Sequence, residues 1–302
     1  MRAATPLLRI VACAALALLL FGCAPAYLSP LERDHPLVGR IWDTRAQAFV
    51  TRDALIQRAA GARLVLLGEI HDNADHHRLQ AEVLAALLKA GRTPVLAMEQ
   101  FDLEHQSALD AARAQGVRDP ERVADAGRFD RRSWIWPQYR PLVEIAVAAN
   151  LPLLAANLSR EDARAVVKTG RPAEGVPAAS AEDRAALEKD IVDGHCGYRP
   201  PPNVLTGMVE AQRARDARMA GVLARADGKG AVLIAGVGHT RRERGAPAYL
   251  PVGLRPEVLS IAFLEVEAGR AEPAPEYAAS YDLVWFTPRV DREDPCAAFR
   301  KR

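Results

Sequence analysis

Six apolar runs of strand length recur along this chain, and they constrain its fold more than any other feature. Stretches with helical periodicity lie between them, most clearly at residues 74–89 and 204–223. Strands that alternate with helices typically form a parallel sheet that is covered by helices on both faces. We therefore predict an α/β fold with a mostly parallel central sheet flanked by helices. The six runs are residues 63–68, 94–98, 151–155, 231–235, 258–266 and 283–286.

The first residues have the pattern of a secretory signal. Arg2 and Arg9 precede an apolar run, residues 10–21, that is too short to span a bilayer. The run closes with LFGC, which resembles a bacterial lipobox, so we expect Cys23 to be lipidated and to anchor the mature chain to a membrane. Ala24 follows where an aspartate would signal retention in the inner membrane, so we expect an exported lipoprotein of the outer membrane.

The chain divides into three predicted segments. A signal peptide covers residues 1–22, a lipidated tether with three prolines covers residues 23–38, and one large domain covers residues 39–302. The stretches near 103–136 and 161–202 are longer than simple crossovers require. We therefore expect them to be helical insertions that cap the C-terminal edge of the strands.

Charge and cysteine content narrow the function classes. The signal contains Arg2, Arg9 and no acidic residue, so its removal lowers the formal charge from +2 to 0 and leaves no electrostatic case for nucleic acid. Outside the signal and the lipobox, the remaining cysteines are Cys196 and Cys296. In an oxidising compartment one disulfide between them is the economical interpretation, with two unpaired thiols as the alternative. The sequence has no G-x-S-x-G, Walker or H-E-x-x-H motif.

Polar side chains follow four of the apolar runs. The carboxyl ends of parallel strands meet at one edge of a sheet, where ligands bind in open α/β folds. Gly68 and Gly236 precede two histidines and permit a sharp turn or a close approach. The acid-rich turn at residues 72–77 also suits a helix N-terminus, so it is a weaker candidate. Residues expected to bind a ligand at this edge are Glu69, His71, Glu99, Asn157 and His239.

Two further polar residues lie on the predicted helix 204–223. Met208, Gln212, Asp216 and Met219 recur at intervals of three or four, so a polar pair interrupts an apolar stripe. Buried polar groups need partners, which predicts that Gln212 and Asp216 lie near the polar strand ends. A helix rim that faces water is the alternative.

The segment SWIWPQYRP carries Trp134, Trp136 and Tyr139. Tryptophan is usually a core residue, but these rings also suit the wall of a flat pocket. Tyr139 lies beside prolines and arginines, which would suit a planar, anionic ligand.

Six motifs occur in this order behind the lipobox: LLGEIHDN, LAMEQF, WPQYRP, AANLSR, MVEAQRARDARMA and IAGVGHTRR. From residue 39 onward the set resembles the ChaN-like haem-binding uptake lipoproteins of the Tiki superfamily. The resemblance implies an α/β domain with a helical cap that serves haem or iron acquisition. It also implies a homodimer that holds haem through a tyrosine, for which Tyr139 is the best match, and an outer-membrane uptake receptor as a partner.

Two functions follow from this resemblance. The first, which we favour, is a membrane-anchored lipoprotein that binds haem or iron for uptake, and not an enzyme. The second is a divalent-metal-dependent hydrolase or peptidase, because relatives of that kind use the same residues. In the hydrolase, Glu69, His71 and His239 would hold the metal ion and Glu99 would activate water.

Overall fold

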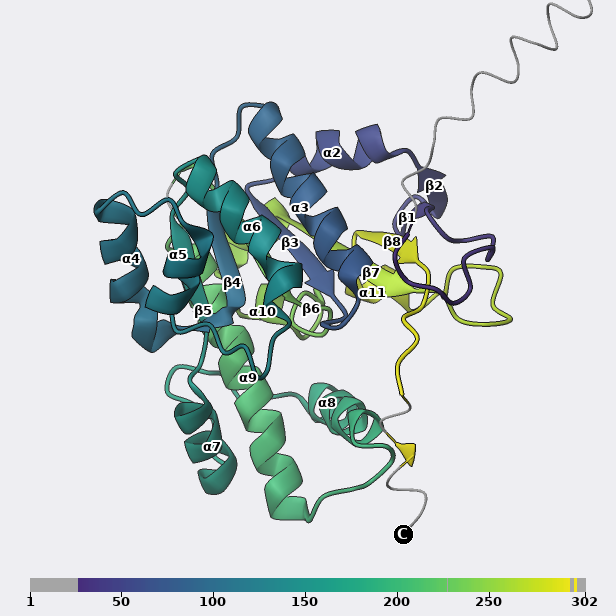
Figure 1. The fold of residues 1–302 in the computed structure, drawn as a ribbon. Coiled ribbons are helices and arrows are strands. Elements are labelled where there is room, and N and C mark those ends of the chain that lie inside the picture. Colours follow the sequence, from purple (N-terminus) through teal and green to yellow (C-terminus); the bar gives the residue numbers. More distant parts are fainter. Residues whose placement is uncertain (1–26, 227, 294–295, 298–302) are drawn as a thin grey trace, which may run out of the picture.

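The computed structural model describes residues 27–226, 228–293 and 296–297, and the expected signal peptide and lipidated Cys23 lie outside them. Within the described residues, eight strands form one sheet in the order β2-β1-β8-β7-β3-β6-β4-β5 (Figure 1). Each predicted apolar run forms one of the strands β3 to β8. The strands are β1 (Ile41–Asp43), β2 (Ala48–Val50), β3 (Leu64–Glu69), β4 (Val95–Asp102), β5 (Leu153–Asn157), β6 (Ala231–Gly236), β7 (Val258–Glu265) and β8 (Leu283–Thr287).

The sheet is mixed, which corrects the prediction of a mostly parallel sheet. The strands β3 to β8 run parallel to one another, but β1 pairs antiparallel with both β2 and β8. The hairpin of β1 and β2 escaped prediction because strands of three residues carry too little alternation to be recognised.

Helices connect the strands and cover both faces of the sheet. The predicted helix over residues 74–89 is α3, and the predicted helix over 204–223 lies within α9. In the described part of the chain, no helix combines the length and apolar character needed to cross a membrane. The helices are α2 (Arg52–Gly61), α3 (Ala74–Lys89), η2 (Leu103–His105), α4 (Gln106–Ala114), α5 (Pro120–Ala126), α6 (Trp136–Ala148), α7 (Arg160–Thr169), α8 (Ala181–Gly194), α9 (Pro202–Ala224), α10 (Ala246–Tyr249), η3 (Val252–Glu257) and α11 (Tyr277–Ser280).

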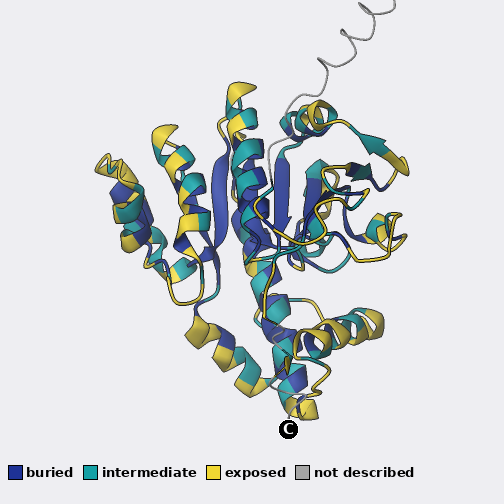
Figure 2. Cartoon of the chain, turned by 45° about the vertical axis from the view of Figure 1, so that its right-hand side comes forward, coloured by how far each residue is buried: buried dark blue, intermediate teal, exposed yellow. Residues whose placement is uncertain are grey.

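Apolar side chains on both faces of the sheet form the core. The central strands β3 and β6 are buried along their whole length, as expected of a sheet covered on both sides (Figure 2). Val65 and Leu67 of β3 belong to the same apolar cluster as residues of α3 and α6 on one face. Leu64 and Leu66 belong to the cluster that includes Met219 of α9 on the other face. The alternation follows from the two-residue repeat of a strand.

Helices α7, α8 and the N-terminal half of α9 extend beyond the sheet (Figure 1). The 23 residues of α9 span about 35 Å at 1.5 Å per residue, whereas a six-residue strand spans about 20 Å. The projecting part of α9 packs against α8, where Leu187 and Ile191 contact Leu205 and Val209. The long stretch expected near 161–202 therefore contains α7 and α8, and the stretch near 103–136 contains α4 and α5.

The amino-terminal residues 27–38 contact the domain, although they were predicted to be part of a tether. The backbone N–H groups of Leu28 and Ser29 donate to the Asp75 carboxylate at 2.9 Å and 2.8 Å, and Leu37 is buried. Asp75 satisfies buried backbone donors here, which makes the packing favourable. The folded domain therefore extends to at least residue 27, which corrects the predicted boundary of the tether.

Candidate functional site

Glu69, the last residue of β3, is the centre of a buried polar cluster. It is 1% exposed, and its Oε1 lies 3.0 Å from Nδ1 of His71 while its Oε2 accepts a 2.8 Å hydrogen bond from Gln80. Burial opposes ionisation of Glu69, but His77 and His71 outweigh it and hold its pKa below the ordinary value. In all, its carboxylate contacts the side chains of His71, His77, Gln80, Gln100 and Tyr139.

These contacts do not support the predicted metal site. A carboxylate offers about four lone-pair positions, and those of Glu69 are directed to protein partners. Glu69 therefore has no oxygen left to share an ion with His71 and His239. In the residues that the structure describes, no group of three or more His, Cys, Asp or Glu side chains could hold a metal ion.

Tyr139 is also not available as the predicted haem ligand. It is fully buried in α6, and its hydroxyl donates to Glu69. Burial and the negative charge of Glu69 raise its pKa far above the ordinary value, so the phenol stays neutral. The WPQYRP motif identified a tyrosine that orients a carboxylate in the core, not one that can reach an iron.

His71 is the member of this cluster that reaches solvent. Its side chain is 45% exposed and packs edge-on against Trp134, with ring centres 4.8 Å apart. A Cβ at Gly236 would lie 2.8 Å from Cε1 of His71, so glycine is what permits the ring to approach β6. Burial lowers the pKa of His71, but Glu69 and Glu99 outweigh it and raise the pKa to about 9. His71 is therefore cationic at neutral pH.

A second pair of an imidazole and a carboxylate lies just past β6. Nδ1 of His239 is 2.7 Å from Oδ1 of Asp216 on α9, and its Nε2 is 3.5 Å from Oε1 of Glu99. Glu99 accepts a 2.7 Å hydrogen bond from the N–H of Gly236. Burial opposes charge on His239, but Asp216 and Glu99 raise its pKa. Glu99 thus lies between His71 and His239, and a carboxylate orients each imidazole through Nδ1.

A polar hollow of about 490 Å³ opens in front of these groups. Trp134 forms part of its wall, whereas Trp136 is buried and donates its indole N–H to Glu121 at 2.6 Å. Glu69 and Asp216 are buried, do not line this hollow, and orient the two histidines. The expected ligand contacts stay a prediction, but the structure brings five of those residues to this hollow: His71, Glu99, Asn157, Gln212 and His239.

The acid-rich turn at residues 72–77 serves the fold. Nδ1 of His76 accepts the backbone N–H of Ile70 at 2.9 Å, and its Nε2 lies 2.8 Å from the Thr287 hydroxyl. Burial lowers the pKa of His76 to about 3, so this ring is neutral. His76 therefore joins β3 to β8 and does not contact a ligand.

A second hollow, also about 490 Å³, lies among α7, α8 and α9. It adjoins the polar hollow, because Arg160, Gln212 and Arg215 line both. The two hollows differ in character, since the second has an apolar wall contributed by all three helices. The apolar residues of this wall are Ala163, Val167, Leu187, Ile191, Met208 and Ala211.

Two arginines of this second hollow have no acidic partner among the residues that the structure describes. Arg160 pairs with Asp130 and Arg244 pairs with Asp190, but among the described residues no ion pair joins Arg164 or Arg215 to a carboxylate.

Arg215 donates from one terminal nitrogen to Gln212 at 2.8 Å, while its Nε is buried without a hydrogen-bond partner in the described part of the chain. A buried donor left unpaired is costly, and an anion in the hollow would satisfy it.

Our sequence interpretation missed His195 and these arginines. Leu187, Ile191 and His195 recur at intervals of four, which places them on one face of α8 and its C-terminal end. That spacing was the available signal for His195. Local patterns do not say which helix this face meets, so the hollow itself could not be foreseen.

A family model described as haem-binding uptake, Tiki superfamily, ChaN matches residues 55–250. A solved structure on cofacial haem binding to ChaN of Campylobacter jejuni is 24% identical, with a TM-score of 0.69 over 81% of this chain and 95% of that one. None of the curated proteins matches the chain.

Two other solved structures are more distant. The type III effector HopBA1 is 17% identical, with a TM-score of 0.45 over 87% of this chain and 98% of that one. A mutant erythromycin esterase in its open conformation is 12% identical, with a TM-score of 0.47 over 85% and 98%.

Proposed function

Because this chain belongs to the ChaN family of haem-binding uptake proteins in the Tiki superfamily, we propose that it binds haem in the hollow among α7, α8 and α9. Haem is flat and largely apolar, and it carries two anionic propionates at one edge. A site for it therefore needs an apolar slot with cations at its border. This hollow combines an apolar wall from three helices with Arg164 and Arg215.

The observation that carries the proposal is the state of Arg215. Its guanidinium has no acidic partner in the described residues, and its buried Nε has no hydrogen-bond partner. A propionate would supply both the charge and the acceptor that this side chain lacks. The polar hollow offers less apolar surface, which is why we favour the hollow among the helices for haem.

Titration of the purified protein with haem tests this proposal through the Soret absorbance. Arg215→Gln should weaken haem binding about 10- to 100-fold, because it removes a charge-assisted hydrogen bond of about 1.5–3 kcal/mol. Arg270→Gln is the matched control, since Arg270 is exposed on the loop after β7 and pairs with Glu267. Equal affinities for both variants would contradict the proposed site, and wild-type protein that takes up no haem would contradict the function.

A hydrolase is the second candidate, favoured by the two oriented imidazoles on either side of Glu99. Such an arrangement is suited to general acid–base catalysis. Glu99→Gln should then abolish hydrolysis of activated ester or peptide substrates while the melting temperature stays close to that of the wild type. Wild-type protein without turnover on such substrates would remove this candidate.

We further propose that lipid on Cys23 anchors an exported protein to the outer membrane, where a dimer passes haem or iron to an uptake receptor. Support comes from the lipobox and from the fold boundary, since only three residues lie between Cys23 and Tyr27 and an extended chain would separate these two by at most about 15 Å. The domain would then lie close to the membrane surface. Cys23→Ser should move the protein out of the membrane fraction, and its retention there would contradict the anchor.

A further inference from the structure

We infer that His195 supplies the imidazole that binds the iron of this haem, an inference that rests on the proposed haem function. His195 directly follows α8 and lines the same hollow as Arg164 and Arg215. The three residues come from three different elements around that hollow. An iron ligand at one wall and guanidinium groups on the other helices match the two kinds of contact that haem requires.

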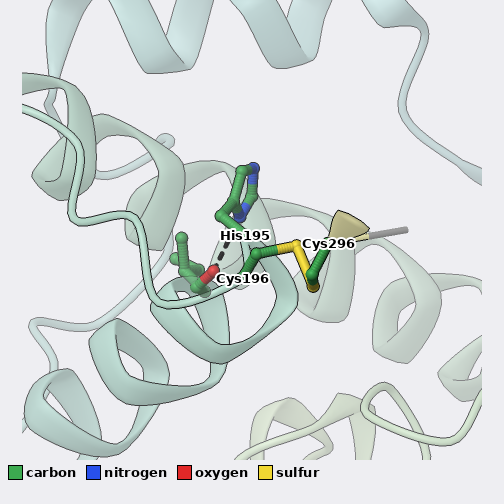
Figure 3. The surroundings of a disulfide bond; sticks show 4 residues. His195, Cys196 and Cys296 are labelled. Atoms are coloured by element: carbon green, nitrogen blue, oxygen red, sulfur yellow. Dashed lines mark hydrogen bonds between the residues drawn. A yellow bond between two sulfur atoms is a disulfide. The ribbon is translucent and has the colours of Figure 1, made fainter. Parts of the chain in front are cut away.

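The hydrogen bond of His195 leaves the correct nitrogen free. Its Nδ1 lies 2.6 Å from the carbonyl oxygen of Ile191, one helical turn back. A carbonyl only accepts, so Nδ1 carries the proton and the lone pair remains on Nε2. Figure 3 shows the ring with one nitrogen on this carbonyl and the other directed away from it. Metal-binding histidines commonly have this arrangement, which fixes the tautomer and the orientation of the ring.

The backbone around His195 is held in place on its C-terminal side. Cys196 has a φ of 62° and Gly197 a φ of 77°, and the N–H of Tyr198 donates to the His195 carbonyl at 3.0 Å. A non-glycine residue in the left-handed region persists where the surrounding structure holds it. Cys196 is held through its disulfide with Cys296 (Figure 3). A ligand fixed in this way loses little conformational entropy on binding.

Other side chains that bind haem iron are less well placed. His71 and His239 contact carboxylates at the polar hollow, and Tyr139 is buried on Glu69. Besides His195, the second hollow offers the thioether of Met208 on α9, a weaker ligand. Tyr198 is 55% exposed but does not line this hollow. His195 is therefore the strongest iron ligand that the hollow provides.

Spectroscopy of the haem complex tests the assignment independently of affinity. Ferric haem bound to the wild type should give the electron paramagnetic resonance and resonance Raman signature of imidazole ligation. His195→Ala should lose that signature and weaken binding by about 10-fold or more, and free imidazole should restore the signature. His105→Ala, which removes a histidine outside the hollow, and Tyr198→Phe should leave the spectra unchanged. The melting temperature of His195→Ala should stay near that of the wild type, because His195 is exposed and makes one hydrogen bond to a carbonyl.

The outcomes separate this inference from the function on which it rests. If the wild type binds haem and Arg215→Gln weakens it, but His195→Ala keeps the imidazole signature, the ligand assignment is wrong and the haem site stands. A tyrosinate signature in the wild type that is lost in Tyr198→Phe would also overturn the assignment. A wild-type protein that binds no haem would overturn both.

Discussion

Gly207 sets the distance between α7 and α9, and its replacement by alanine tests the packing that builds the second hollow. A Cβ at this position would lie 2.1 Å from the carbonyl oxygen of Val167 on α7. To reach 3.0 Å, below which real Cβ contacts are essentially absent, α7 would have to retreat by about 0.9 Å. The clashing atom belongs to the backbone, so no side-chain rotation can relieve it.

Two effects of known size oppose each other in Gly207→Ala. Alanine gains about 1 kcal/mol of helix propensity over glycine, while overpacking against a backbone atom costs roughly 1–3 kcal/mol or more. We expect a net loss of about 1–2 kcal/mol in the free energy of unfolding. Gly221→Ala on the same helix is the matched control, because its nearest neighbour is the Arg225 guanidinium at 3.7 Å. That variant should gain up to about 1 kcal/mol.

Urea denaturation followed by circular dichroism measures this difference of about 2–3 kcal/mol between the two variants. Haem titration provides the second measurement, because Val167 lines the second hollow and a shift of α7 should weaken binding in Gly207→Ala alone. If Gly207→Ala is as stable as Gly221→Ala, the contact between α7 and α9 is not as close as described. If its haem affinity is unchanged, α7 is not a wall of the binding site.

Three further perturbations have defined outcomes. Replacing Cys196 and Cys296 by serine opens a loop with a sequence separation of 100 and should cost about 3–5 kcal/mol, measured by thermal unfolding; an unaltered melting temperature would contradict this. Tyr139→Phe removes a hydrogen-bond donor to buried Glu69 and should lower the free energy of unfolding by roughly 1–3 kcal/mol in denaturant titrations. A variant as stable as the wild type would contradict the role of this hydrogen bond in the Glu69 cluster. The raised pKa of His71 predicts an imidazole titration midpoint of about 9 by nuclear magnetic resonance. Its contribution to the free energy of unfolding should be fully present below pH 6.5 and be lost as the pH rises through about 9. A midpoint near 6.5 would contradict this prediction.

The parts of the fold that were predicted are those whose signal is local. Buried strands such as β3 and β6 are continuous apolar runs, and α3 has a complete apolar stripe and an Asn73 cap. The hairpin of β1 and β2 was missed because its three-residue strands carry too little alternation, and its long-range pairing with β8 is something local patterns cannot reveal. The packing of residues 27–38 was missed for the same reason, since the acceptor of their N–H groups is Asp75 on α3.

The same distinction between local and long-range signals applies to the candidate site. Positions at strand ends could be read from the sequence, so His71, Glu99 and His239 were expected together, and the structure gathers them at one hollow. The sequence does not show how many side chains each of these polar groups contacts in the folded protein. Glu69 was expected to be a metal ligand but accepts from protein donors, and Tyr139 was expected to hold haem but is one of those donors.

The pairing of β1 with β8 has a consequence for the order in which the molecule assembles. Ile41 lies opposite Trp285, so β1 cannot pair with β8 until the chain between them has been synthesised. That synthesis takes roughly 10–50 s at about 5–20 residues per second. A two-stranded hairpin is marginal by itself, so β1 and β2 are expected to stay unstructured on the growing chain throughout that interval. The hairpin of β1 and β2 is thus synthesised before the other strands but is among the last to join the sheet. A nascent chain that stops before residue 283 leaves β7 as an open edge that is available to pair with another chain.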